Sequence, residues 1–165
     1  KTFFAVSTSR GCPYSCTFCS VPVFTGKLFR VRSPENVINE ILLLKEKYNV
    51  GRIDILDDNF TMNLERAKQI CRLIIKNKLE IKWSTPNGVR ADRLDDELAM
   101  LIKKSGCDDI AIGIESVDNE VLRKMKKGET IENIERGINL LKKNNISIKG
   151  FFIIGSNGEN VFPRE

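Results

Sequence analysis

Short apolar stretches alternate along this chain with segments whose apolar residues recur every three or four positions. The first pattern predicts buried β-strands and the second predicts amphipathic helices. Five strands are predicted, at residues 3–7, 52–56, 81–85, 109–114 and 147–154. Strands and helices in strict alternation are typical of an α/β fold with a parallel sheet. With right-handed crossovers, five such units predict an open, partial (βα) barrel of the TIM type.

Capping residues mark where the helices begin and end. Ser33, Pro34 and Glu35 place an N-cap, a proline at the first helical position and an early acid, so a helix is predicted from there. Later helices are predicted to follow Asn63, Asp95, Asp118 and Thr130. Two of them are predicted to stop at Gly106 and Gly128, because glycine adopts the left-handed conformation that closes a helix.

The fourth predicted strand has one bulky face and one small face. Alternate residues of a strand point to opposite sides of the sheet. One side carries Ile110, Ile112 and Ile114, and the other carries Ala111, Gly113 and Glu115. The bulky face is expected to pack on helices, while the small face lines the interior and leaves room for a cavity. Glu115 would project into its mouth, where a carboxylate needs a partner; the alternative is a surface glutamate at a strand end.

Composition describes a globular chain of one-domain size. The 165 residues are 41% hydrophobic and 30% charged, and no apolar run reaches membrane-spanning length. Because the first residues already have a strand pattern, residues 1–165 are expected to be one domain excised from a longer protein. The net charge of +5 is mild, and the lysines at 124, 126 and 127 are expected to form a solvated helix end. Binding of nucleic acid by this segment is therefore not supported.

Three of the five cysteines, Cys12, Cys16 and Cys19, lie within eight residues with the spacing C-x3-C-x2-C. Gly11 and Pro13 let this loop bend so that three thiolates can converge on one metal centre. A structural zinc site needs four ligands, and the chain has no histidine to supply the fourth. Three ligands on a four-iron cluster leave one iron open to a substrate or cofactor. Zinc, a disulfide and a purely structural cluster are the alternatives.

The other two cysteines stand alone downstream. Cys71 falls on the apolar face of the second predicted helix, and Cys107 falls in the turn before the fourth strand. Both are expected to be buried, because free cysteine packs as a small apolar group. Free thiols also indicate a reducing compartment, so the expected location is the cytoplasm.

The cysteine loop, with Phe18 in the position before the last cysteine, resembles the C-x3-C-x-aromatic-C signature of the radical S-adenosylmethionine superfamily. The resemblance implies a [4Fe–4S] cluster ligated by Cys12, Cys16 and Cys19. It implies that the open iron binds S-adenosylmethionine, which is cleaved reductively to a 5′-deoxyadenosyl radical. Phe18 would shield the cluster near the nucleoside. The implied fold is a six-unit partial barrel, of which about five units are present.

The same resemblance implies roles for residues that follow the strands. Asp57 or Asp58 would contact the cofactor's amino group, Glu115 and Ser116 the ribose, and Gly155 would allow close approach to the adenine. Arg90 could pair with the cofactor carboxylate, since a guanidinium fits a carboxylate well, or form a structural salt bridge. Residues 155–160 depart from the Gly-x-Pro-Gly-Glu-Thr pattern of many relatives.

The strand-end sequences are most similar to the branch of the superfamily that carries an upstream cobalamin-binding domain. This implies methylation or rearrangement of an unactivated carbon, with flavodoxin or ferredoxin as the reductant. The runner-up is a methylthiotransferase core acting on tRNA or a ribosomal protein. Hypotheses from other classes are a non-catalytic iron–sulfur electron-transfer or binding module and a zinc-stabilised interaction domain.

Overall fold

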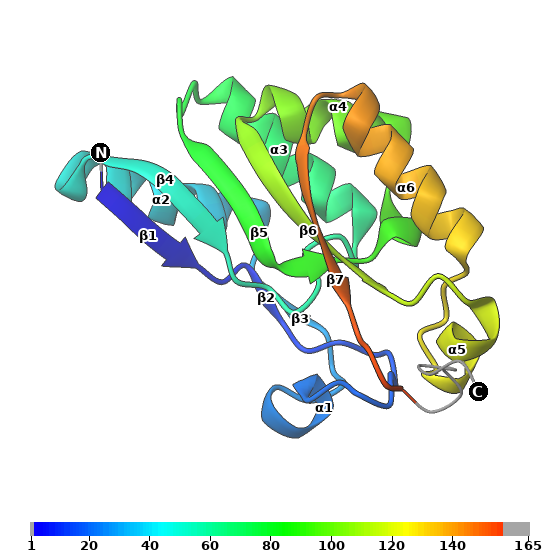
Figure 1. Ribbon diagram of the computed structural model, residues 1–165. Coiled ribbons are helices and arrows are strands. Elements are labelled where there is room, and N and C mark those ends of the chain that lie inside the picture. Colours follow the sequence, from blue (N-terminus) through cyan, green and yellow to red (C-terminus); the bar gives the residue numbers. More distant parts are fainter. Residues whose placement is uncertain (1, 157–165) are drawn as a thin grey trace.

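The computed structural model describes residues 2–156 and shows one five-stranded parallel sheet (Figure 1). The strand order is β1 (Thr2–Val6), β4 (Val50–Ile55), β5 (Lys82–Val89), β6 (Cys107–Glu115) and β7 (Ser147–Phe152). Each strand pairs in parallel with the next, so every connection is a crossover. The predicted α/β class and partial (βα) barrel are confirmed.

Four long helices lie on one face of this sheet (Figure 1). They are α2 (Pro34–Tyr48), α3 (Leu64–Lys76), α4 (Asp96–Lys104) and α6 (Ile131–Lys143). The predicted caps form: the side chains of Ser33, Asn63, Asp95 and Thr130 each accept a hydrogen bond from a backbone N–H in the first turn of their helix. Asp118 does the same for the shorter α5 (Asn119–Lys124).

The core lies between the sheet and these helices. Ile110, Ile112 and Ile114 are buried there, as the alternation in β6 predicted. Cys71 and Cys107 are also buried, as expected, although Cys107 begins β6 and does not lie in a turn. None of the helices described for residues 2–156 combines the length and apolar character that a bilayer span requires.

The segment between β1 and α2 contains small elements that the hydrophobic pattern did not predict. Strands β2 (Ser9–Arg10) and β3 (Arg30–Val31) form an antiparallel ribbon, and α1 (Val21–Phe24) lies on the excursion between them. Figure 1 shows α1 and the ribbon beyond the carboxyl ends of the sheet strands. Elements of two to four residues are too short to produce a period, which is why the sequence did not reveal them.

Strand β5 also continues past its predicted end at Thr85. The strand was predicted at residues 81–85, before Pro86, and proline has no N–H to donate to a sheet ladder. The structure instead interrupts the pairing with β6 between Thr85 and Val89 and resumes it at Val89. This irregularity turns Asn87 and Gly88 toward the cavity described next. The short η1 helix (Ala91–Arg93) follows directly.

Candidate functional site

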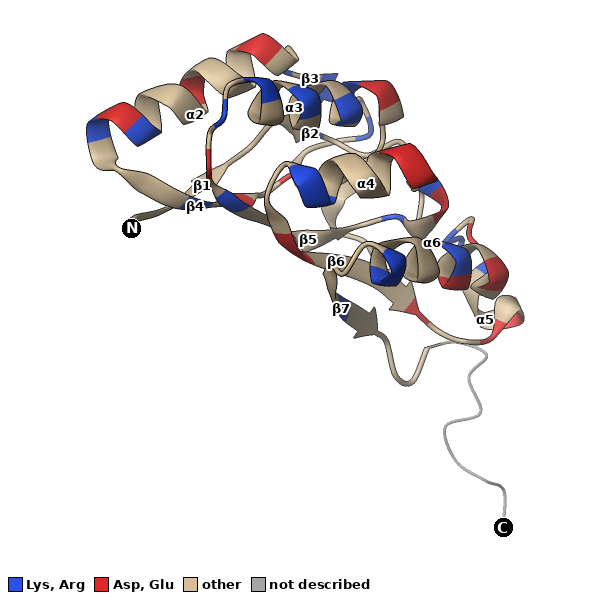
Figure 2. Cartoon of the chain, turned by 90° about the horizontal axis from the view of Figure 1, so that it is seen from above, with Lys and Arg blue, Asp and Glu red and all other residues tan. Residues whose placement is uncertain are grey.

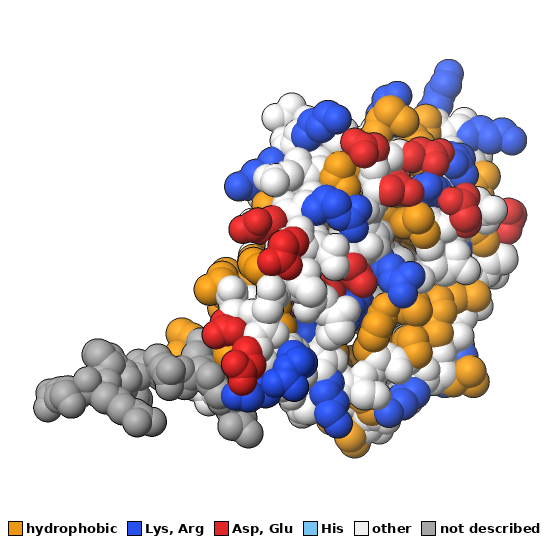
Figure 3. All heavy atoms as spheres, turned by 90° about the vertical axis from the view of Figure 1, so that its right-hand side faces the viewer, with side chains coloured by type: hydrophobic (Ala, Val, Ile, Leu, Met, Phe, Trp, Pro, Cys, Tyr) orange, Lys and Arg blue, Asp and Glu red, His pale blue; other side chains and the backbone are white. Residues whose placement is uncertain are grey.

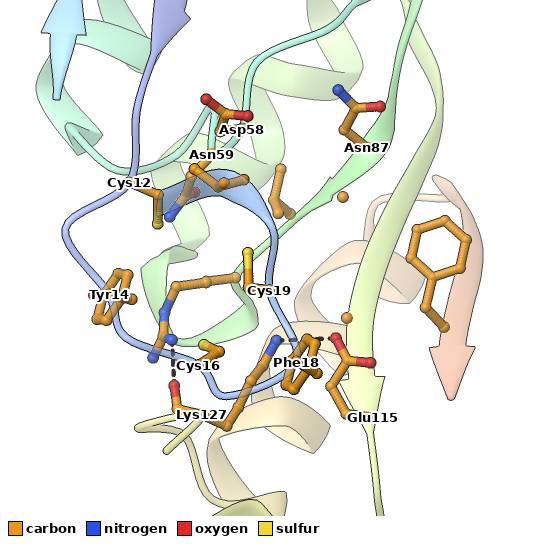
Figure 4. Close-up of a pocket in the computed structure, with 16 residues that line it drawn as sticks. Cys12, Tyr14, Cys16, Phe18, Cys19, Asp58, Asn59, Asn87, Glu115 and Lys127 are labelled. Atoms are coloured by element: carbon orange, nitrogen blue, oxygen red, sulfur yellow. Dashed lines mark hydrogen bonds and ion pairs between the residues drawn. The ribbon is translucent and has the colours of Figure 1, made fainter. Parts of the chain in front are cut away.

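A cavity of about 340 Å³ opens at the carboxyl ends of the parallel strands (Figure 4). Its wall combines the cysteine loop with the ends of β4, β5 and β6 and one residue of β7. Seven of the residues singled out in the sequence line it: Cys12, Cys16, Phe18, Cys19, Asp58, Arg90 and Glu115. Three others, Asp57, Ser116 and Gly155, do not.

The cysteine loop is fixed at several points along its backbone. Gly11 has a φ of +88°, and a side chain there would collide with the carbonyl oxygen of Leu28. The backbone N–H of Cys12 donates to the carbonyl of Gly26, and that of Thr17 donates to the carbonyl of Met125, which follows α5. The first contacts hold the loop against a later part of the same excursion, and the bond from Thr17 ties it to the segment after α5.

All three loop cysteines are free thiols of intermediate exposure. Burial raises the pKa of the Cys12 and Cys16 thiols, and for Cys16 the nearby cations of Lys127 and Arg90 oppose that rise. A positive environment favours the thiolate, which is the form that ligates a metal. Figure 4 shows the sulfur atoms of Cys12, Cys16 and Cys19 around a common space.

The two aspartates after β4 have different environments. Asp57 is buried, and its carboxylate accepts hydrogen bonds from the backbone N–H and hydroxyl groups of both Thr8 and Ser9. These four bonds tie the start of β2 to the segment after β4, and Asp57 does not line the cavity. Asp58 lines the cavity, and its Oδ2 accepts from Gly11 N at 2.7 Å and from the Thr25 hydroxyl at 2.8 Å. The sequence did not distinguish the roles of Asp57 and Asp58, whereas in the structure only Asp58 lines the cavity.

Glu115 is positioned by a distortion of β6. Its φ of +64° is left-handed, and the pairing with β7 shifts between Gly113 and Glu115. Such a bulge re-aims a side chain at the cost of local strain. The carboxylate is buried and accepts from Lys127 Nζ at 3.4 Å (Figure 4). The partner that a carboxylate at this position requires is therefore Lys127.

Lys127 corrects the prediction of a solvated lysine cluster. Its side chain is 8% exposed, and its ammonium lies 3.4 Å from both Glu115 Oε1 and Glu129 Oε2. Lys124 and Lys126 remain on the surface. Burial raises the pKa of Glu129, and the cations of Arg90 and Lys127 oppose that rise. No sequence signal distinguished Lys127 from its neighbours, because a lysine at a helix end is usually solvated.

Arg90 lies between the cavity and a network of structural contacts. Its guanidinium pairs with Asp92 at 3.0 Å and donates to the backbone carbonyls of Lys127 and Gly128. It also covers the ring of Tyr14, with 3.8 Å from Cζ to the ring centre. Arg90 therefore forms the structural salt bridge that was one of its two predicted roles, and it also lines the cavity. Tyr14 is a site residue that the sequence reasoning missed, although it lies within the cysteine loop.

Of the remaining predicted residues, Phe18 lines the cavity, whereas Ser116 and Gly155 do not. Phe18 stays 42% exposed. The hydroxyl of Ser116 accepts from the backbone N–H of Asp118, so it stabilises the turn before α5. Gly155 lies after β7 with a φ of +82°. Residues 157–160 of the divergent final motif lie outside the described part of the chain.

The three thiols of the cysteine loop all line this cavity. Within residues 2–156, no group of three or more histidine, cysteine or carboxylate side chains is close enough to bind one metal ion. The three thiols instead surround a space, and a cubane cluster needs that arrangement because each thiolate binds a different iron. The adjoining cavity, with charged groups of both signs and apolar surface, has room for a small zwitterionic ligand beside them.

Comparison with known proteins gives one family. The sequence profile described as the radical SAM superfamily matches residues 6–165. An uncharacterised methyltransferase of Pyrococcus horikoshii is 37% identical over 153 residues, which is 93% of this chain and 33% of that protein. The chain thus spans about a third of the length of this relative.

Solved structures show the same fold. The radical S-adenosylmethionine methyltransferase TsrM of Kitasatospora setae, with cobalamin and a [4Fe–4S] cluster bound, superposes with a TM-score of 0.87 at 23% identity. That match covers 95% of this chain and 32% of TsrM. The cobalamin-dependent enzyme OxsB, with aqua-cobalamin and S-adenosylmethionine bound, gives a TM-score of 0.75 at 26% identity, covering 91% of this chain and 23% of OxsB.

Proposed function

The chain belongs to the radical SAM superfamily, and from this premise we propose that it is the core of a cobalamin-dependent methyltransferase acting on an unactivated carbon. The cofactors of the family are a [4Fe–4S] cluster and S-adenosylmethionine, as the sequence predicted. Enzymes of this family need a reductant. When bound, the cluster supplies the electron that cleaves S-adenosylmethionine reductively.

One observation carries the proposal: three thiols and a set of paired charges line the same cavity at the carboxyl ends of a parallel sheet. Cys12, Cys16 and Cys19 would ligate the cluster. In parallel barrels this end holds the reacting groups, because the loops after the strands converge there. The similarity to a methyltransferase at 37% identity supports the reaction class.

The chain's own groups would orient the zwitterionic cofactor. Lys127 and Arg90 place two cations on the wall, which suit a carboxylate. Asp58 and Glu115 place two acceptors, which suit an ammonium and ribose hydroxyls. The apolar ring of Phe18 would help to exclude water from the sulfur atoms of the cysteines. Asp57, with four internal hydrogen bonds, is assigned to positioning the loop rather than to the cofactor.

Cobalamin would be held by a further domain. The relatives and the solved structures are about three to four times as long as the part that this chain matches. OxsB binds cobalamin and is 26% identical, which supports the same cofactor in the whole protein. Residues 1–165 would then be the radical SAM core domain, with a flavodoxin or ferredoxin as the electron donor.

The test is anaerobic reconstitution of the full-length protein with iron and sulfide, followed by a strong reductant. The expected result is a brown protein that converts S-adenosylmethionine to 5′-deoxyadenosine. Cys16→Ala should lose both the colour and the cleavage. Cys71→Ala is the matched control, because Cys71 is fully buried on the inner face of α3 and burial raises the pKa of its thiol to about 12. That variant should keep the cluster.

Other outcomes identify other functions. A cluster that forms without cleavage would indicate an electron-transfer module, and a colourless zinc protein would indicate a structural metal domain. Cleavage that is unaffected by removing cobalamin, with sulfur delivered to the product, would indicate a methylthiotransferase. Retention of the cluster by Cys16→Ala would refute the ligand assignment.

A further inference from the structure

The positive charge of this chain is concentrated in its first segment. Residues 1–34 contain five Lys and Arg and no Asp or Glu, whereas residues 35–165 contain 22 of each sign. The whole excess of five positive charges therefore lies on the segment that carries the cysteine loop. The net charge of the whole chain is mild, but the excess of positive charge lies entirely in residues 1–34.

Elsewhere the charges are compensated locally. Figure 2 shows Lys and Arg together with Asp and Glu on α2, α4 and α6. On the side where α5 and α6 lie, Figure 3 shows basic and acidic side chains interleaved. Lys68, for example, pairs with Asp95 and Glu97, each at 2.8 Å. Only the first segment departs from this arrangement.

The ribbon formed by β2 and β3 holds two arginines opposite one another. Arg10 and Arg30 are cross-strand partners and share one face. Like charges in this arrangement repel, and no carboxylate of residues 2–156 pairs with either arginine. Both line a second cavity of about 400 Å³ with Arg32, whose own charge pairs with Glu40. Arg30 donates to the backbone carbonyl of Thr25 at 2.7 Å, but neither arginine has a carboxylate partner in the described part of the chain, and an anionic group from outside would balance their charges.

Exposed apolar side chains lie beside these arginines on the excursion between β2 and β3. Val23, Phe24 and Leu28 are 83%, 82% and 70% exposed. Lys27, also exposed, adds a third cation among them. An apolar centre with a charged rim is the usual composition of a protein-docking surface. A small anion would use the arginines and leave these side chains in water, so a protein partner accounts for both features.

The same excursion carries Cys12, Cys16 and Cys19, so the surface belongs to the segment that holds the proposed cluster ligands. We propose that Arg10, Arg30 and Lys27, with Val23, Phe24 and Leu28, form the basic docking surface for an acidic one-electron carrier protein. This proposal rests on the proposed function, because it assigns the place where the required reductant binds. The reduced carrier gives one electron to the cluster and leaves oxidised by one electron, and no bond is formed or broken between the two proteins.

The test compares Arg10→Glu with Lys104→Glu in the full-length protein. Arg10 makes no side-chain contact that the fold needs, and a glutamate there faces Arg30 with the opposite charge, so Tm should not fall. Lys104 is exposed at the end of α4 and gives the same change in net charge. Calorimetric titration with oxidised flavodoxin measures binding without any turnover. Cleavage of S-adenosylmethionine is then measured with reduced flavodoxin and with dithionite.

Arg10→Glu should weaken flavodoxin binding about tenfold, with a similar loss in the flavodoxin-dependent rate, because charge steers such encounters. Dithionite-driven cleavage should be unchanged, and Lys104→Glu should match the wild type in every measurement. Higher salt should weaken wild-type binding more than that of Arg10→Glu.

Three results would overturn the docking surface. They are unchanged flavodoxin binding in Arg10→Glu, an equal loss in Lys104→Glu, and loss of cleavage with both donors in Arg10→Glu. A wild-type protein that binds flavodoxin but cleaves nothing with either donor would refute the proposed function and leave the surface standing. Inhibition by inorganic phosphate that disappears in Arg10→Glu, without any effect on flavodoxin binding, would make the arginines a small-anion site.

Discussion

The helix-covered face of the sheet and its carboxyl end are built from the same strands by different rules. On the helix side, Ile110, Ile112 and Leu98 are at most 1% exposed and contact other apolar side chains. At the carboxyl end, Glu115, Lys127 and Arg90 are also nearly buried, but their partners are charges. The side chains of the two regions are thus buried to a similar degree, but apolar contacts stabilise one region and ion pairs stabilise the other.

The difference shows which region can gain further stabilisation when a ligand binds. Apolar packing is complete without a ligand, because each side chain already fills the space next to it. A buried ion pair beside a cavity is stabilised less fully, since the desolvation of the two charges offsets much of their attraction. Changes on the helix side should therefore cost stability, and changes at the carboxyl end should cost ligand binding as well.

Leu98→Ala should have the largest effect on stability. Leu98 is fully buried in α4, and truncation of a buried leucine costs between about 2 and 5 kcal/mol of unfolding free energy through lost burial and the cavity left behind. Urea unfolding of the full-length protein measures it. The folded fraction should bind S-adenosylmethionine as the wild type does, and a selective loss of binding would contradict the separation of the two regions.

Lys127→Ala should affect both properties. It leaves Glu115 and Glu129 without their shared cation, and we expect a loss of about 3 kcal/mol, less than in a dry interior because the cavity admits water. Affinity for S-adenosylmethionine in the reconstituted protein should also fall more than tenfold. Lys126→Ala is the control. Because Lys126 is exposed, the unfolding free energy of this variant should differ from that of the wild type by less than about 0.5 kcal/mol. Equal effects of the two variants would show that burial of Lys127 has no functional consequence.

Two glycines give a matched comparison of steric change. A Cβ on Gly137 of α6 would lie 2.6 Å from the carbonyl oxygen of Ala91, a backbone atom that cannot move freely. Gly137→Ala should therefore cost about 1–3 kcal/mol of unfolding free energy by overpacking. A Cβ on Gly113 would meet only the ends of the Glu115 and Lys127 side chains, which can shift.

Gly113→Ala should consequently change the unfolding free energy by less than about 1 kcal/mol. The displaced Glu115 and Lys127 lie on the cavity wall, so its affinity for S-adenosylmethionine should fall about tenfold. Urea unfolding and ligand titration of both variants give the comparison. If Gly137→Ala loses the ligand and Gly113→Ala loses the stability, the assignment of the two regions is reversed.

The sequence predicted the helix-covered region well and the carboxyl end only in outline. Period and capping are local signals, so the helix starts after Ser33, Asn63 and Asp95 could be found from neighbouring residues alone. The cysteine spacing is local too, and it located the site. The different environments of Asp57 and Asp58 depend on Thr8, Ser9 and Thr25, which lie more than 30 positions away. Adjacent residues contain no information about such partners.

Lys127 and the β2–β3 ribbon were missed for the same physical reason. The burial of Lys127 depends on Glu115, twelve residues earlier, and on a bulge in β6 that has no sequence period. The ribbon pairs two strands of two residues across a long excursion. In both cases a tertiary contact overrides the usual local preference, a solvated lysine in one and an irregular loop in the other.

The smallest expected effect concerns a charge on the helix side, Asp95. It caps α4 by accepting from Leu98 N at 2.7 Å, and Lys68 Nζ lies 2.8 Å from its other oxygen. Although partial burial opposes it, the hydrogen bonds from Lys68 and Leu98 hold the pKa of Asp95 below its ordinary value of 3.8. A depressed pKa stabilises the fold at pH values above 3.8, and this stabilisation is lost as pH falls through the folded-state pKa.

Asp95→Asn keeps a good N-cap and removes the charge, so it isolates the ion pair. At pH 7 it should lower the unfolding free energy by less than about 1 kcal/mol, because the pair is partly exposed and screened. The deficit should shrink at high salt and vanish at acid pH, where the wild-type carboxyl is protonated. Urea unfolding of both proteins across pH measures this. A deficit that persists in acid would mean that Asp95 contributes through its cap geometry and not through the ion pair with Lys68.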